Sequence, residues 1–159
     1  MPEQLFDLAH AHGIGVEFWD FKPPLEGVYV SHREDFIPPQ IGLDKKLRQD
    51  KKRLRCILAE ELGHHFTTVG SAYSKKFYFY SDRVWTSQIE YRAMKWAGEY
   101  LIPLPRIKTA LQYGMFQIWE LADYFEVTND FMRFRLALPD VKTLFYHKGG
   151  TYGELSKTW

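Results

Sequence analysis

The chain has 159 residues, of which 45% are hydrophobic and 17% aromatic, and this composition excludes an intrinsically disordered protein. Its 21 basic and 20 acidic side chains leave a formal net charge of +1, so bulk charge favours neither a nucleic acid nor a membrane surface as partner. A chain of this length is expected to form a single domain, residues 1–159, with a core large enough to need no disulfide bonds.

Cysteine content and the first residues indicate the compartment. The single cysteine, Cys56, cannot form a disulfide bond within the chain, which fits a reducing environment. No apolar run approaches the roughly 18 residues of a membrane-spanning helix, and the first residues lack the basic and apolar regions of a signal peptide. We therefore expect a soluble, cytoplasmic protein with no membrane partner.

Residues 1–44 are predicted to form a short helix followed by a small sheet. Residues 3–12 carry apolar side chains at helical spacing, and Gly13 ends the pattern. Three short strand-like segments follow at residues 14–18, 27–30 and 41–44, separated by turns that contain paired prolines. Their hairpin-like spacing predicts a three-stranded antiparallel sheet.

Residues 54–66 predict a helix with one apolar stripe and one polar stripe. The apolar side chains recur every four residues, at Leu54, Leu58, Leu62 and Phe66. Glu60 and His64 are also four residues apart, so they lie only about 40° apart around the helix axis and can reach one ion from the same side. Carboxylate oxygen and imidazole nitrogen are both zinc ligands, and this spacing therefore predicts half of a metal site.

The sequence Glu-Glu-Leu-Gly-His at residues 60–64 resembles the HExxH helix of metallopeptidases, with Glu60 in place of the first histidine. Downstream, Glu90, Ala93, Ala97 and Leu-Ile-Pro at residues 101–103 resemble the segment that follows the active helix in the ImmA/IrrE family of metallopeptidases. The resemblance implies an α+β, zincin-like fold in which the small sheet packs on the active-site helix. Residues 45–103 are expected to contain the metal-site helices. The resemblance also implies that Glu90 is the third metal ligand beside Glu60 and His64.

Glu90 and His65 each allow a second interpretation. Ser87 and Glu90 satisfy the capping-box pattern, so on its spacing alone Glu90 could equally cap the helix predicted from Ser87 to Pro103. That helix is expected to bury a stripe at Ile89, Ala93, Trp96, Ala97 and Tyr100. His65 points about 100° away from His64, and a ligand pair of Glu61 and His65 would leave Leu62 at the position of the base, so this register is rejected.

The resemblance implies a zinc cofactor, with another divalent metal as the alternative, and a fourth coordination position left for water. Glu61 is expected to act as the general base that takes the proton from this water. Two carboxylates and one imidazole would leave the zinc complex formally neutral, and hence the metal a weaker electrophile than with two histidines. Tyr73 and His65 are candidates for stabilising the oxyanion, by proximity in sequence only.

Seven basic residues lie between Lys45 and Arg55, on the approach to the active helix. They could form a phosphate-binding patch or a solvated helix face. No stacking aromatic residue is interleaved with them, and the rest of the chain balances their charge, so we favour the solvated face.

Residues 104–138 are predicted to form a helical bundle, with helices near 105–112, 117–125 and 128–137, and residues 139–159 a loose tail. Residues 119–136 resemble a helix-turn-helix in which Thr128 caps the second helix and Glu126 stands where the turn often has glycine. Asn129 and Asp130 lie where a recognition helix would meet DNA. Direct DNA binding is therefore not expected, and we interpret this segment as a packing module.

The resemblance implies a zinc-dependent endopeptidase that works through metal-activated water. Relatives of this architecture cleave helix-turn-helix repressors of phages and mobile elements, so the expected partner is a protein substrate of that kind. Two alternatives stay open. Because Glu60 replaces a histidine, the chain could be a metal-weakened or inactive regulatory or binding module. Arg133 and Arg135 would support a DNA-binding regulator that uses residues 117–137.

Overall fold

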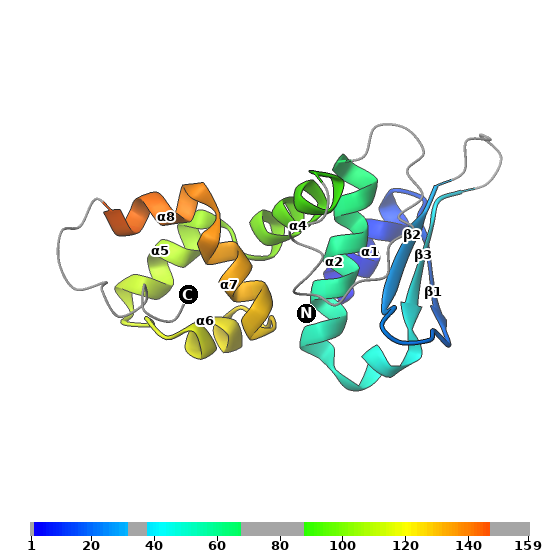
Figure 1. Ribbon diagram of the computed structural model, residues 1–159, viewed down its shortest axis with the longest axis horizontal. Coiled ribbons are helices and arrows are strands. Elements are labelled where there is room, and N and C mark those ends of the chain that lie inside the picture. Colours follow the sequence, from blue (N-terminus) through cyan, green and yellow to red (C-terminus); the bar gives the residue numbers. More distant parts are fainter. Residues whose placement is uncertain (1, 32–37, 68–87, 147–159) are drawn as a thin grey trace. The chain divides into compact units, whose positions relative to one another are not determined.

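A computed structural model describes residues 2–31, 38–67 and 88–146 of the chain. Over these residues the protein has three strands, seven α-helices and one 3-10 helix, which confirms the predicted α+β class (Figure 1). The chain divides into two compact units, Met1–Ala97 and Gly98–Trp159. No helix among the described residues has the length and apolar character needed to cross a membrane.

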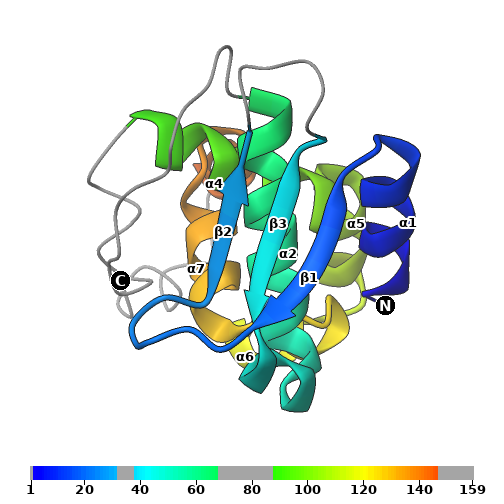
Figure 2. The same ribbon diagram turned by 90° about the vertical axis from the view of Figure 1, so that its right-hand side faces the viewer.

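The first unit contains a three-stranded sheet in the order β1-β3-β2 (Figure 2). Its strands are β1 (Gly15–Trp19), β2 (Gly27–Val30) and β3 (Gln40–Asp44). Strand β2 runs antiparallel to β3, with Gly27 opposite Leu43. Strand β1 runs parallel to β3, with Val16 opposite Ile41.

The sheet is therefore mixed, and the prediction of an antiparallel sheet was wrong for the pair β1 and β3. The prediction assumed that strands adjacent in sequence pair with each other. Instead β3, whose last four residues are all buried, takes the centre of the sheet, where both of its edges are covered. The half-exposed strands β1 and β2 take the two edges.

Helices α1 (Glu3–Ala11) and α2 (Lys51–Thr67) cover one face of this sheet (Figure 1). The 3-10 helix η1 (Lys45–Gln49) leads from β3 into α2, and Asp50 accepts a hydrogen bond from the backbone N–H of Arg53 in the first turn of α2. Leu54, Leu58 and Leu62 of the predicted apolar stripe are buried, as are Ile41 and Leu43 of β3, whereas Phe66 is half-buried. Helix α2 is buried on other faces as well, for example at Cys56 and Ala59.

Helix α4 (Gln88–Leu101) buries a different stripe from the predicted one. Ala93 and Ala97 are fully buried as expected, but Ile89 and Tyr100 are 40% and 43% exposed. The residue that fills the core beside the alanines is Met94. Ala93 faces α2 at Gly63, where the two backbones meet, and the buried face of α4 runs through Ala93, Met94 and Ala97.

Basic residues of η1 and of the first turn of α2 make contacts within the first unit. Lys45 forms an ion pair with Asp20 at 2.8 Å, and Arg53 forms one with Glu26 at 2.7 Å. The guanidinium of Arg48 lies 4.3 Å from the ring centroid of Phe18. These contacts support a solvated, ion-paired face.

The second unit contains α5 (Leu104–Gln112), α6 (Ile118–Tyr124) and α7 (Asn129–Ala137), within about a residue of the predicted helices. Between α6 and α7, Glu126 has a φ of 53°, the left-handed conformation for which glycine is the usual residue. Thr128 caps α7 as predicted, because its hydroxyl accepts a hydrogen bond from the N–H of Phe131 at 3.2 Å.

Residues 139–146, predicted as part of a tail, form a further helix, α8 (Pro139–Tyr146). Pro139, followed by the acidic Asp140, is a signal for the start of a helix, and the prediction overlooked it. Asp140 also receives two hydrogen bonds from the guanidinium of Arg135, at 2.9 and 2.8 Å. This ion pair ties α8 to α7.

Candidate metal centre

Three side chains predicted as metal ligands converge in the first unit. Glu60 and His64 come from α2 and Glu90 comes from the first turn of α4, and each offers a ligand atom within 4.8 Å of the others. Within the described residues, these three side chains are placed so that they could hold one metal ion together. Glu60 is fully buried, and the side chains of His64 and Glu90 are only 4% and 13% exposed. We refer to these three residues as the ligand cluster.

A glycine on α2 allows the two helices to bring the ligand cluster together. A Cβ atom at Gly63 would overlap the backbone carbonyl of Ala93, with the carbonyl carbon only 2.8 Å away. The α2 and α4 backbones are therefore in direct contact at this point. Because Glu90 precedes Ala93 by about one helical turn, this contact brings the Glu90 carboxylate within reach of His64.

The spacing within the ligand cluster fits a shared cation. His64 Nε2 lies 3.2 Å from Glu90 Oε2. Two ligand atoms of a tetrahedral zinc ion, each about 2.0–2.1 Å from the metal, are about 3.3 Å apart. Two carboxylate oxygens and one imidazole nitrogen also form a donor set that zinc accepts.

The electrostatics of the ligand cluster also favour a positive charge. Burial alone would lower the pKa of His64, but the hydrogen bond to Glu90 and the negative charges of Glu61, Glu90 and Glu60 outweigh it and raise the pKa to about 9. Without a metal, the imidazole therefore carries a proton at neutral pH. A divalent cation would supply positive charge at the same position.

Glu61, the predicted base, is a neighbour of the ligand cluster but does not belong to it. It is 2% exposed, and its carboxylate lies against strand β2. A Cβ atom at Gly27 would lie 2.7 Å from Glu61 Oε1. Glu61 therefore flanks the ligand pair of Glu60 and His64 on the side of α2 that faces β2.

His65 also faces β2, as its position on the helix predicts. Its Nδ1 atom and the hydroxyl of Tyr29 are hydrogen-bonded at 2.9 Å, and its ring lies edge-on to those of His12 and Phe66. Burial, and secondarily the nearby His12, lower the pKa of His65. Its partner Tyr29 was missed from the sequence, because no local spacing links β2 to α2.

Two of the sequence hypotheses lie outside the described residues. Tyr73 was a candidate for stabilising the oxyanion, and Ser87 was the residue with which Glu90 would form a capping box. Both belong to residues 68–87. The capping-box interpretation of Glu90 is thus not tested, whereas the position of its carboxylate beside His64 fits the interpretation as a metal ligand.

A protein-family model described as the IrrE N-terminal-like domain, peptidase family M78, matches residues 9–137. The match includes both segments that carry the ligand cluster. No curated protein and no solved structure matches the chain.

Proposed function

The chain belongs to the IrrE N-terminal-like family of M78 peptidases, and on this basis we propose that it is a zinc-dependent endopeptidase. The observation that carries the proposal is the ligand cluster, in which Glu60, His64 and Glu90 converge in a buried position from two helices. The family suggests a metallopeptidase-type function and a divalent metal. Zinc, the substrate and the roles of single residues are our proposals.

The donor set favours zinc over the harder divalent ions. Magnesium and calcium prefer sites made entirely of oxygen, whereas zinc readily binds the imidazole of a residue such as His64. When bound, zinc polarises a peptide carbonyl and makes water a stronger acid. With two carboxylates, Glu60 and Glu90, the ion keeps less net charge and attracts electrons less strongly than at a site with two histidines.

Glu61 is the residue proposed to move protons. It follows Glu60 directly, so its side chain flanks the ligand cluster without being part of it. As a general base it would take the proton from the attacking water and then deliver it to the amine that leaves. Its burial against β2 holds the carboxylate in one place.

The proposed substrate is an extended peptide segment of another protein. Strand β2 pairs with β3 on one side and is an edge strand of the described sheet, so an extended chain could add to it by main-chain hydrogen bonds. Such a chain would pass close to Glu61, which contacts Gly27 at the start of β2. The family resemblance supports a helix-turn-helix repressor as partner, cleaved at one site.

The helix-turn-helix segment offers less support for DNA binding than its sequence suggested. Arg135 is 1% exposed, and its guanidinium donates hydrogen bonds to Asp140 and to the carbonyl of Ile102. Arg133 pairs with Asp130 on the same helix. Arg135 is therefore part of the internal packing of the second unit, which favours a packing module.

The substitution Glu61→Gln tests the proposed chemistry. Glutamine is nearly isosteric with glutamate but cannot accept the proton, so zinc binding should persist while cleavage falls on the order of 10²–10⁴-fold. The substrate is the repressor encoded nearest to this gene, with casein as the control for general proteolysis. Unchanged cleavage by Glu61→Gln would exclude Glu61 as the base. A repressor left intact by the zinc-loaded wild-type protein, or casein digested equally well, would contradict the proposed substrate.

A further inference from the structure

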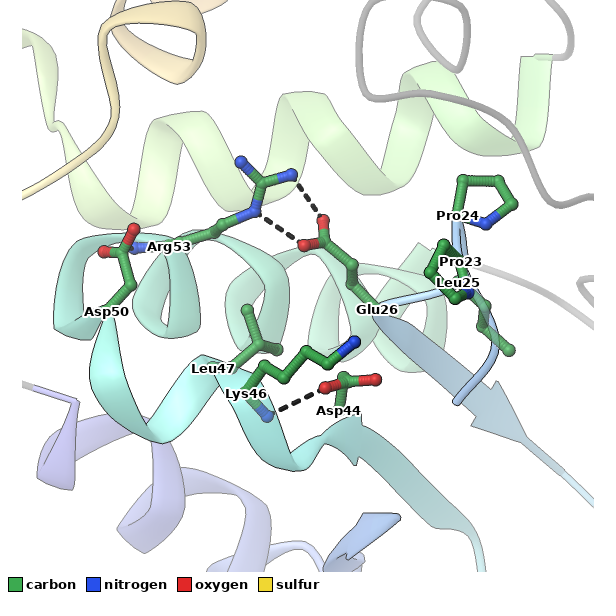
Figure 3. A pocket seen from close by; sticks show the side chains of 9 residues that line it. All are labelled: Pro23, Pro24, Leu25, Glu26, Asp44, Lys46, Leu47, Asp50 and Arg53. Atoms are coloured by element: carbon green, nitrogen blue, oxygen red, sulfur yellow. Dashed lines mark hydrogen bonds and ion pairs between the residues drawn. The ribbon is translucent and has the colours of Figure 1, made fainter. Parts of the chain in front are cut away.

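One stripe of α2 faces strand β2 along its whole length. Its members are spaced every four residues: Arg53, Ile57, Glu61 and His65. The two outer members are tied to β2 or to the residue before it. Arg53 donates two hydrogen bonds of 2.7 Å to the Glu26 carboxylate (Figure 3), and His65 bonds to the Tyr29 hydroxyl at 2.9 Å.

Between these two ties, Gly27 meets the middle of the stripe. Residues two apart point to the same face of a strand, so Gly27 and Tyr29 both face α2, and both are buried. A Cβ atom at Gly27 would lie 2.6 Å from Ile57 Cγ2, 2.7 Å from Glu61 Oε1 and 3.1 Å from Glu61 Cγ. The Glu61 side chain and an Ile57 methyl group thus occupy the space that any side chain at residue 27 would need. We call these contacts of Glu26, Gly27 and Tyr29 with the stripe the β2 clamp.

The β2 clamp and the ligand cluster lie on adjoining sides of α2. Glu61 is about 100° around the helix from Glu60 and about 60° from His64. Glu90 approaches from α4, at the contact between Gly63 and Ala93. None of the three ligands is among the groups nearest to Gly27, so a side chain added there acts first on Ile57 and Glu61.

We propose that Gly27 is a positioning residue for Glu61. Because residue 27 has no side chain, the Glu61 carboxylate lies directly against the edge strand to which a peptide would add. The proposal rests on the proposed role of Glu61 as base, and it adds that strand β2 sets the position of that base. A side chain at residue 27 overlaps both the Ile57 methyl group and the Glu61 carboxylate, so the carboxylate or the strand has to move away. Either displacement would separate the base from the peptide.

The test compares Gly27→Ala with Gly15→Ala, a matched glycine exchange in strand β1. A Cβ at Gly15 would meet only the end of the Gln40 side chain, which is free to turn away. The carboxyl carbon signals of zinc-loaded protein, labelled with ¹³C at glutamate, report the position of the base directly, and the Glu61 signal is identified by its loss in Glu61→Gln. Gly27→Ala should shift the Glu61 signal and leave those of Glu60 and Glu90 in place, whereas Gly15→Ala should shift none of them.

Zinc titration and peptide cleavage complete the comparison. Gly27→Ala should bind zinc as tightly as the wild type, while kcat falls about 10²-fold, the cost of displacing a catalytic group by about 1 Å. An unshifted Glu61 signal, or zinc affinity lost in step with kcat, would overturn the proposal.

A second variant serves if Gly27→Ala does not fold. Tyr29→Phe removes the hydroxyl bonded to His65 without adding volume, so it should loosen the β2 clamp and shift the same Glu61 signal. If Tyr29→Phe leaves that signal unchanged, the clamp does not hold Glu61 and the proposal fails. A wild-type protein that cleaves neither the repressor nor casein, but whose Glu61 signal still responds to Gly27→Ala, would contradict the peptidase function and support the positioning role of Gly27.

Discussion

The substitution Gly63→Ala tests how the two ligand-bearing helices are held together. The new Cβ would lie 2.8 Å from the carbonyl carbon of Ala93 and 2.9 Å from its Cα. Non-bonded carbon atoms normally lie about 3.5–4.0 Å apart, so the α4 backbone has to withdraw by about 1 Å. Both groups are rigid backbone, and no side-chain rotation relieves the overlap.

The withdrawal of α4 should reach the ligand cluster. Glu90 lies one turn before Ala93, so it moves with the helix, and its 3.2 Å separation from His64 should increase. A gap of about 4 Å exceeds the roughly 3.3 Å between ligands of a tetrahedral zinc ion. We expect zinc affinity to fall on the order of 10–100-fold, the range seen when residues that support metal ligands are changed. Overpacking should also lower the free energy of unfolding by about 1–3 kcal/mol.

A competition titration against a chromophoric zinc chelator measures this affinity. The control is Gly98→Ala, the same exchange within α4, where the new Cβ would meet only side-chain atoms of Arg135 and Phe134, the nearest at 3.2 Å. Gly98→Ala should bind zinc like the wild type. A folded Gly63→Ala protein with unchanged zinc affinity would show that the contact with Ala93 does not position Glu90.

Two further predictions concern single side chains. Glu60→His should tighten zinc binding in the chelator titration, because imidazole suits a borderline-soft ion better than carboxylate does; unchanged affinity would mean that Glu60 is not a ligand. In the second unit, the hydrogen bonds from Arg135 hold the pKa of Asp140 below its ordinary value. The ionised Asp140 therefore stabilises the folded protein fully above the pKa of aspartate in the unfolded chain, about 3.9. This stability is lost as the pH falls through the lower pKa of Asp140 in the folded protein. Urea unfolding should therefore show wild type more stable than Asp140→Asn at pH 6, with the difference shrinking below about pH 4; a difference independent of pH would contradict this role of Asp140.

The parts of the site that could be predicted are those encoded within one helix. The spacing of Glu60 and His64, and the apolar stripe through Leu58 and Leu62, follow from the helical repeat alone. Glu90 is about thirty residues away, and no periodicity links it to His64. Its assignment needed the resemblance to a family motif, and in the structure its carboxylate lies 3.2 Å from His64 Nε2.

The features that the sequence did not reveal depend on contacts between elements. Strand β3 lies at the centre of the sheet and is its most buried strand. The spacing of the strands along the chain contains no information about their order in the sheet. Helix α4 exposes Ile89 and buries Met94 beside Ala93, a choice of buried face that the spacing of its apolar residues left open. The contact of Gly27 with Glu61 likewise joins a strand and a helix that are far apart in the chain, and a glycine in a short strand gives no sign of it.

Metal content measured on purified protein tests the ligand cluster most directly. Wild-type protein, His64→Ala and Glu90→Ala are each supplemented with zinc, freed of excess metal and analysed for bound zinc by mass spectrometry, with circular dichroism to confirm folding. We expect one zinc ion per wild-type chain, and its loss from both folded variants, because each removes one of three ligands. A wild-type protein that stays metal-free after supplementation, or variants that retain a full equivalent of zinc, would contradict the proposed metal centre.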